Sequence, residues 1–175
     1  MESLAREITK DDLKRAPYFD QFDPEKEYTK ALYKGDKPLL GQELNEVQSI
    51  QSYHLGNLGN SIMEDGDIQS GMDFVMGDDH TLTVKYGIVY ANGKVRRFNE
   101  QTIQLDGEGM EYVGVDVRTE VVTYEDDEDL LDKTSGLPSS FSDASDRLRE
   151  TVFLTKGDES LPHVIYQFEA GDLYV

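Results

Sequence analysis

Residues 41–52 read GQELNEVQSIQS, and this stretch decides the fold. From Gly41 onward the apolar residues recur at steps of three and four, which is the spacing of one face of an α-helix. The pattern continues to about residue 63 and gives way to short strand-like runs at about Gly66. We therefore predict one helical segment over residues 41–66. Its apolar stripe consists of Leu44, Val47, Ile50 or Gln51, Leu55, Leu58 and Ile62.

Four residues of this segment bear on its stability. Glu43 and Glu46 lie near the helix start, where the helix dipole favours negative charge. Gly56 and Gly59 each weaken the second half by about 1 kcal/mol relative to alanine. Two interpretations of these glycines remain open from sequence alone. Their small size permits close approach of another backbone, or they mark a fraying helix end.

The residues before the helix predict an extended N-terminal arm over residues 1–40. Prolines at positions 17, 24 and 38 interrupt any long helix there, although a short one over Lys10–Arg15 is compatible with the sequence. The arm contains three aromatic residues within five positions: Tyr18, Phe19 and Phe22. These are candidate anchors for a neighbouring protein. The alternative is that they fold back on the chain's own β domain.

The residues after the helix predict an antiparallel β domain over residues 67–175. Asn92-Gly93 lies between two β-rich runs, and this dipeptide is typical of a two-residue hairpin turn. No helical pattern separates the runs, which favours antiparallel pairing over crossover units. The predicted fold class is α+β, with an irregular arm, one long helix and a mainly antiparallel β domain. The predicted strands cover residues 81–86, 87–90, 94–98, 101–105, 111–118, 119–124, 151–156 and 163–169.

Composition excludes several classes of function. The chain carries 36 acidic and 17 basic residues, a net charge of −19, which repels nucleic-acid backbones and favours a basic partner. Cysteine is absent, so disulfides and thiolate chemistry are excluded. There is neither an apolar run of membrane-spanning length nor a signal-peptide pattern. We therefore expect synthesis in the cytoplasm, no membrane insertion and no nucleic-acid partner.

Motifs of catalysis and cofactor binding are also missing from the sequence. The three histidines lie far apart, and neither a Gly-x-Ser-x-Gly elbow nor a phosphate-binding glycine loop occurs. Residues 64–67 read EDGD, but the acidic spacing and terminal glutamate of a calcium loop are not met. The sequence therefore predicts no catalytic residue, no cofactor and no metal site, and we expect that the protein is not an enzyme.

Four segments carry a resemblance to a known family. They are YFDQFDP at residues 18–24, QELNEVQSI at 42–50, GIVYANG at 87–93 and DRLRETV at 146–152. In this order and spacing they resemble the N-terminal region of large baseplate or tail-fibre proteins of long-tailed phages. The similarity covers roughly residues 17–155. The chain departs from the family where Gly35-Asp36 replaces a Pro-Gly turn, and it is shorter than such proteins usually are.

The resemblance implies a structural virion protein, an attachment module of a phage baseplate or tail fibre that is made in the host cytoplasm. Its implied partners are other baseplate or tail proteins and copies of itself, as a homotrimer. Gln48 and Gln51 would suit a bundle of parallel helices, where buried polar residues fix the register. A monomer whose helix lies on its own sheet is the alternative. The residues predicted to form partner interfaces are Leu44, Val47, Gln51, Leu55 and Leu58 on the helix, and Tyr18, Phe19 and Phe22 on the arm.

Two functions of other classes compete with this prediction. One is a carbohydrate-binding or depolymerising β domain at the tail tip, in which the aromatic residues line a sugar groove. The other is a free-standing acidic adaptor or assembly chaperone.

Overall fold

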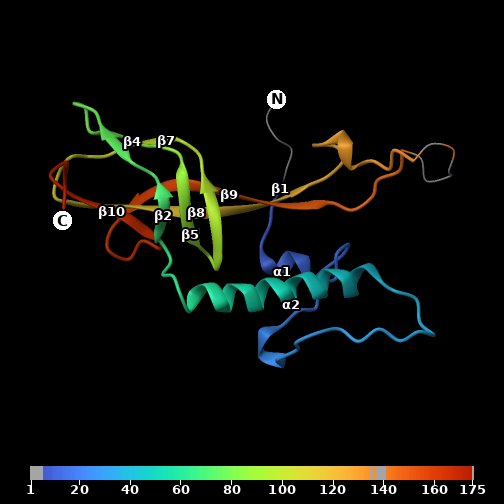
Figure 1. Ribbon diagram of the computed structural model, residues 1–175. Coiled ribbons are helices and arrows are strands. Elements are labelled where there is room, and N and C mark those ends of the chain that lie inside the picture. Colours follow the sequence, from blue (N-terminus) through green and yellow to red (C-terminus); the bar gives the residue numbers. More distant parts are fainter. Residues whose placement is uncertain (1–5, 135, 137–140, 175) are drawn as a thin grey trace.

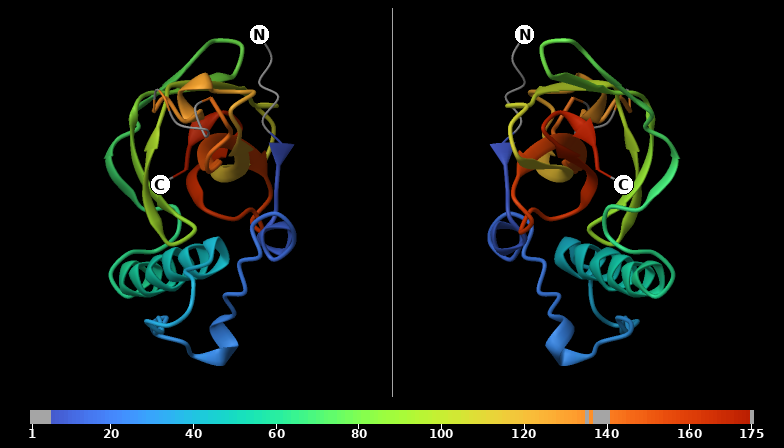
Figure 2. Two further views of the ribbon diagram at one scale, coloured as in Figure 1. Left: turned by 90° about the vertical axis from the view of Figure 1, so that its right-hand side faces the viewer. Right: turned by 90° about the vertical axis from the view of Figure 1, so that its left-hand side faces the viewer.

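The computed structural model describes residues 6–134, 136 and 141–174, and it confirms the predicted α+β fold class. A β domain occupies one side of the molecule, and one long helix, α2 (Gly41–Asn60), lies across its lower edge (Figure 1). Residues 24–40 of the arm pass beneath α2, on the side of the helix away from the strands, whereas residues 6–13 lie on the side of the strands (Figure 1, Figure 2). The helix is therefore placed between residues 24–40 and the β domain.

Helix α2 begins at the predicted residue and ends at Asn60, before the predicted boundary. At its start, the Glu43 carboxylate accepts a hydrogen bond from the backbone N–H of Leu40 at 3.0 Å, which satisfies a donor that has no partner within the helix. Past the helix end, the chain turns at Gly66, whose φ of 99° lies in the left-handed region that favours glycine. Gly66 donates its N–H to the carbonyl of Tyr90 at 2.9 Å, and this bond ties the turn to the β domain.

In the residues that the structure describes, the β domain contains three antiparallel sheets. One contains β2 (Ile68–Gly71), β5 (Gly87–Ala91) and β6 (Lys94–Phe98), and a second contains β3 (Phe74–Met76), β4 (Thr81–Val84) and β7 (Gln101–Gln104). The third sheet, of five strands, contains β1 (Arg6–Glu7), β8 (Met110–Val122), β9 (Arg147–Gly157), β10 (Val164–Glu169) and β11 (Asp172–Leu173).

The turn at Asn92-Gly93 is confirmed as the connection between β5 and β6. Both residues have positive φ, 50° and 71°, as a two-residue hairpin turn with this dipeptide requires. The strand prediction differs from the structure in several places. It omits β1, β2, β3 and β11, and it starts β9 at residue 151 instead of Arg147. The two separate runs predicted at residues 111–118 and 119–124 form the single strand β8. β8 stays continuous because it pairs without interruption with β9, from Tyr112 opposite Gly157 to Val122 opposite Arg147.

The hydrophobic core lies between the five-stranded sheet and the two smaller sheets. Phe168, Val113 and Leu154 come from the five-stranded sheet, and they pack with Leu82 and Phe98 from the two smaller ones. All five side chains are buried. The residues of this core come from the strands and, in Met72 and Leu105, from the segments that follow them. Helix α2 and the arm lie outside this core and keep part of their surface for other contacts.

The arm is only partly extended. Its first described residues form β1, which pairs with β8, and a short helix α1 (Lys10–Leu13) follows at the predicted place. The turn η1 (Pro24–Lys26) comes next, and the chain from residue 27 to residue 40 contains neither helix nor strand. In the acidic loop after β8, residues 128–130 form a second short turn, η2 (Glu128–Leu130). Residues 1–5 of the predicted arm lie outside the described part of the chain, as do residues 135, 137–140 and 175 of the predicted β domain.

Among residues 6–134, 136 and 141–174, no helix combines the length and apolar character needed to cross a membrane. In the same residues, no three acidic or histidine side chains converge on a position that could hold a metal ion.

Candidate interaction surface

Helix α2 rests on the β5–β6 hairpin through its two interior glycines. A methyl group on Gly59 would lie 2.9 Å from Cε2 and 3.0 Å from Cζ of Tyr90, whereas one on Gly56 would lie at an ordinary 3.5 Å from the Gly93 carbonyl. The buried hydroxyl of Tyr90 donates to Asn60 Oδ1 at 2.7 Å, so this side chain has little freedom to move away. Of the two interpretations left open by the sequence, close approach to another backbone is correct for Gly56, which lies against Gly93, whereas Gly59 lies against the side chain of Tyr90. Both glycines lie within the helix.

We expect alanine substitutions at these two glycines to have opposite effects on stability. Alanine stabilises a helix interior by about 1 kcal/mol relative to glycine. Gly56→Ala should raise the free energy of unfolding by part of this amount, because its methyl group fits without a clash. Gly59→Ala should instead lower the free energy of unfolding, because the methyl group displaces the held ring of Tyr90. Urea unfolding of both variants tests this, and equal effects at the two positions would contradict it.

The arm is tied to the helix and to β9 at one junction. The Tyr18 hydroxyl donates to Asp146 Oδ2 at 2.6 Å, just before β9, and Asn45 Nδ2 of α2 donates to the Tyr18 carbonyl at 2.9 Å. Ser49 Oγ, one helical turn further on, donates to the buried carboxylate of Asp20. Three of the segments that carried the resemblance therefore meet in space, although up to 128 positions separate their residues.

Tyr18 gives this junction a pH dependence. Burial, with the hydrogen bond to Asp146 and the negative charge of that residue, raises the pKa of Tyr18 from 10.0 to about 12. A raised pKa in the folded state means that the contribution to stability is complete below pH 10.0 and is lost as the pH rises toward about 12. Tyr18→Phe should lower the free energy of unfolding by about 1 kcal/mol at neutral pH.

The difference between Tyr18→Phe and the wild type should shrink above pH 10.0. Tyr33→Phe, at an exposed tyrosine of the same arm, serves as the control and should leave stability unchanged. Chemical denaturation over the pH range measures both differences. A Tyr18→Phe difference that stays constant with pH would contradict the assigned role of this hydroxyl.

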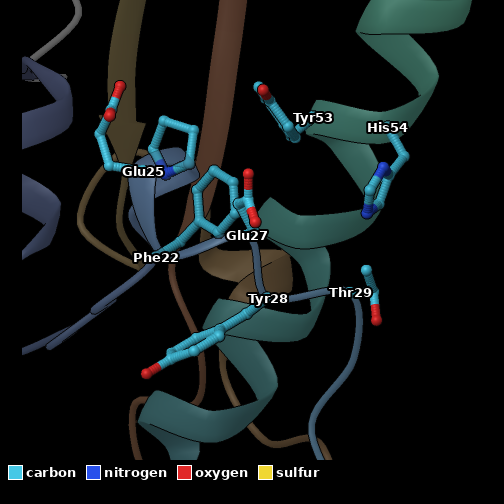
Figure 3. A pocket seen from close by; sticks show the side chains of 8 residues that line it. Phe22, Glu25, Glu27, Tyr28, Thr29, Tyr53 and His54 are labelled. Atoms are coloured by element: carbon cyan, nitrogen blue, oxygen red, sulfur yellow. The ribbon is translucent and has the colours of Figure 1, made fainter.

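The three aromatic residues predicted as anchors have different surroundings. Tyr18 is bound to Asp146, and the ring of Phe22 lies 5.5 Å from the ring of Tyr53 on α2. Phe19 is exposed. Between η1 and α2 lies a hollow of about 410 Å³ (Figure 3). Its lining comprises Phe22, Pro24, Glu25, Glu27, Tyr28 and Thr29 from the arm, and Tyr53 and His54 from the helix.

The helix residues predicted to form an interface mostly face solvent. Leu55 and Leu58 are 66% and 58% exposed, and Leu44 and Gln51 are exposed as well. Val47 is partly buried and lies at the margin of this surface. Gln48, which is exposed, completes it, and Ile62 extends it into the turn after the helix at 73% exposed. We call this surface the seam, and it consists of Leu44, Gln48, Gln51, Leu55, Leu58 and Ile62.

The seam lies on a third side of α2. Successive helix residues are about 100° apart around the axis, so the side chains of one helix divide into faces. Gly56 and Gly59 face the hairpin, and Tyr53 faces Phe22 of the arm. The seam residues occupy the remaining face, which no described element of the chain covers. Ile50, which the sequence placed in the stripe as an alternative to Gln51, is buried against the chain itself and so does not belong to the seam. The leucines of the stripe face water, and such an apolar surface is suited to another protein.

Charge distinguishes this surface from the rest of the molecule. Residues 47–63 contain no Asp, Glu, Lys or Arg, although such residues make up 30% of the chain and about five would be expected in 17 positions. On a chain with a net charge of −19, copies repel each other least where no acidic residue is present. The seam is therefore a place where copies can approach closely.

A second apolar surface lies in the arm. We call residues 28–40 the strap. It holds three lysines and one aspartate, so its net charge of +2 is opposite in sign to that of the whole chain. Sequence reasoning missed its exposed residues, because isolated leucines and tyrosines in an irregular segment resemble core residues. They are Tyr28, Leu32, Tyr33, Leu39 and Leu40.

The contacts between arm, helix and strands indicate one folded unit, and comparison with protein families agrees. The family described as a domain of unknown function (DUF4815) matches residues 16–175. The chain belongs to this family. The DUF4815 match begins just before Tyr18 and so includes the junction with Asp146, the seam and the strap in one domain. A comparison with curated proteins gave no match, and neither did one with solved structures.

Proposed function

We propose that this protein is a structural component of a phage virion, an attachment module of the baseplate or tail fibre without enzymatic activity. The observation that carries the proposal is the seam, an exposed and uncharged apolar helix face on a strongly acidic domain. Such a surface suits permanent assembly. The proposed location in the virion is supported by the resemblance of four sequence segments to phage tail proteins.

In this proposal the seam joins copies of the chain, most simply as a homotrimer. Each exposed leucine that is buried between copies contributes about 1.5–3 kcal/mol to association, and the seam contains three leucines per chain. Light scattering should give three times the chain mass of 19.8 kDa. If light scattering gives the mass of a single chain at all concentrations, the proposed self-association is wrong.

The strap is proposed to hold a neighbouring tail protein with an acidic, partly apolar surface. Its lysines and exposed aromatic side chains are complementary to such a partner. Leu32→Ser combined with Tyr33→Ser should leave the fold intact, because both side chains are exposed, and should reduce incorporation into virions several-fold. A mass-spectrometric inventory of purified particles measures this. Normal copy number of the variant would contradict the role of the strap.

The same inventory separates this function from that of an assembly chaperone, because a chaperone would be missing from mature particles. If the wild-type protein is not found in purified virions, the structural function is wrong.

A carbohydrate-binding function is the second candidate, favoured by the hollow between η1 and α2. Phe22, Tyr28 and Tyr53 line it together with Glu25 and Glu27, and aromatic faces with nearby carboxylates are able to bind sugar rings (Figure 3). Incubation with host polysaccharide tests this candidate. Binding that is lost in Tyr28→Ala would support it, and turnover of the polysaccharide would overturn the structural proposal.

A further inference from the structure

The order of residues along the seam contains information about how copies are oriented. The seam residues are spaced by four, three, four, three and four positions, which is the heptad spacing of helices that pack side by side. Two polar residues, Gln48 and Gln51, lie in its first half, and the second half is entirely apolar. The seam is therefore asymmetric from end to end.

This asymmetry distinguishes two possible arrangements. If two helices ran antiparallel with the whole seam overlapping, residue 44 would face residue 62. Gln48 would then face Leu58, and Gln51 would face Leu55. Each glutamine amide would then be buried against a leucine. Nε2 of Gln48 donates to the Leu44 carbonyl of its own helix at 3.3 Å, but the Gln48 side-chain oxygen and the Gln51 amide would find no hydrogen-bond partner on the facing leucines. Burial of unpaired polar groups is costly.

In a parallel, in-register arrangement each residue instead faces its own copies. Glutamine amides both donate and accept hydrogen bonds, so the copies of Gln48 satisfy one another, as do those of Gln51. Leu55, Leu58 and Ile62 then form a continuous apolar layer. Polar residues at such positions are known to select register and orientation at some expense of stability.

The charges near the helix start are compatible with a parallel arrangement. It places the copies of Glu43 and Glu46 at the same end of the assembly, although both residues lie off the seam, about 100° or more around the helix from Leu44. A second hollow, of about 270 Å³, lies at the start of α2, and Lys34 and Lys37 of the strap line it together with Glu43. These lysines place positive charge at that end of the helix. The uncharged stretch over residues 47–63 adds no repulsion along the remainder of the helix.

We infer that copies of this chain associate through parallel, in-register α2 helices, with Gln48 and Gln51 as hydrogen-bonded layers inside the assembly. This rests on the self-association in the proposed function and specifies its geometry. The partner of the seam is a second copy of the same chain, related by rotation about an axis along the helices. All β domains then lie at one level around that axis, and all straps extend from the same end.

Cysteine cross-linking tests this directly, because the natural chain contains no cysteine. Single variants Gln48→Cys and Leu58→Cys are each treated with a short bismaleimide, alone and as an equal mixture. A parallel assembly cross-links each variant with itself. An antiparallel assembly cross-links only the mixture, through positions 48 and 58, and that result would overturn the inference. Asn57→Cys, exposed on the same helix but outside the seam, is the control and should remain uncross-linked.

A second variant tests the role of the glutamines. In the Leu58→Cys background, Gln48→Leu combined with Gln51→Leu makes the seam apolar throughout, so the yield of self-cross-linked product should fall by about twofold or more. An unchanged yield would show that the glutamines do not select orientation and would overturn that part of the inference.

Light scattering of the untreated wild type distinguishes a failure of self-association from a failure of the parallel orientation alone. If it shows monomers, self-association and orientation both fail. If it shows an assembly while cross-links join positions 48 and 58, only the orientation fails.

Discussion

Replacing Leu58 by aspartate is expected to convert the assembly of copies into monomers, whereas replacing the neighbouring Asn57 by aspartate should leave the assembly intact. Both residues are exposed, and both substitutions add one negative charge to the same turn of α2. Only Leu58 lies on the seam. Comparison of the two variants therefore distinguishes the loss of a buried interface contact from a general increase in repulsion between acidic chains.

The expected size of this effect follows from transfer free energies. Loss of a buried leucine removes about 1.5–3 kcal/mol per copy, and a buried carboxylate without a partner adds a penalty of several kcal/mol. Because every 1.4 kcal/mol is a tenfold change in affinity, the association constant should fall by at least about 100-fold for each contact. Sedimentation or light scattering over a concentration series measures this. Circular dichroism establishes whether the Leu58→Asp variant stays folded. A folded variant that still assembles would show that the seam is not the interface between copies.

The helix and most strands could be predicted because their signals are local. Apolar spacing fixed the start of α2 at Gly41, and the positive φ values available to Asn92 and Gly93 fixed the hairpin. The joining of two predicted runs into β8 could not be predicted in this way. It depends on pairing with β9, which lies about 35 positions away along the chain, and a polar residue pair such as Arg118-Thr119 is read locally as an interruption.

The residues that form the seam could also be predicted only in part from the sequence. The sequence identified an apolar stripe, but the choice between Val47 and Gln48 depends on which side of α2 rests on the hairpin. That side is set by Gly56 and Gly59 against Gly93 and Tyr90, a contact between distant segments. The hydrogen bond between Tyr18 and Asp146 likewise had no local signal, because both residue types are common on protein surfaces.

The second large effect concerns the ion pairs that join the hairpin to the five-stranded sheet. Glu150 of β9 accepts hydrogen bonds from Lys94 Nζ at 2.6 Å and from Arg96 Nη1 at 3.0 Å, both on β6. The Arg96 side chain is only 8% exposed, and its Nε also donates to the Ala91 carbonyl. Because the hairpin carries α2 on its turn, these ion pairs indirectly position the seam relative to the β domain.

Glu150→Gln should therefore destabilise the fold strongly, because it leaves the buried charge of Arg96 without a negative partner. Removing one member of a buried pair costs about 3–5 kcal/mol, and we expect about 2–4 kcal/mol because Glu150 is partly exposed. Glu100→Gln is the matched control. Its ion pair with Lys85 is much more exposed, so its loss should lower the free energy of unfolding by less than about 1 kcal/mol.

The pH dependence of the same variant provides an independent test. Burial by itself would raise the pKa of Glu150, but the hydrogen bonds from Arg96 and Lys94 outweigh it and hold the pKa below its usual 4.5. A depressed pKa means that the stabilisation is present above pH 4.5 and is lost as the pH falls through the folded-state value. The difference in unfolding free energy between wild type and Glu150→Gln should thus be constant near neutral pH and shrink in acid. Urea denaturation at neutral and at acidic pH measures this difference. If it is the same at both pH values, protonation of Glu150 does not control the stability of the contact between the two sheets.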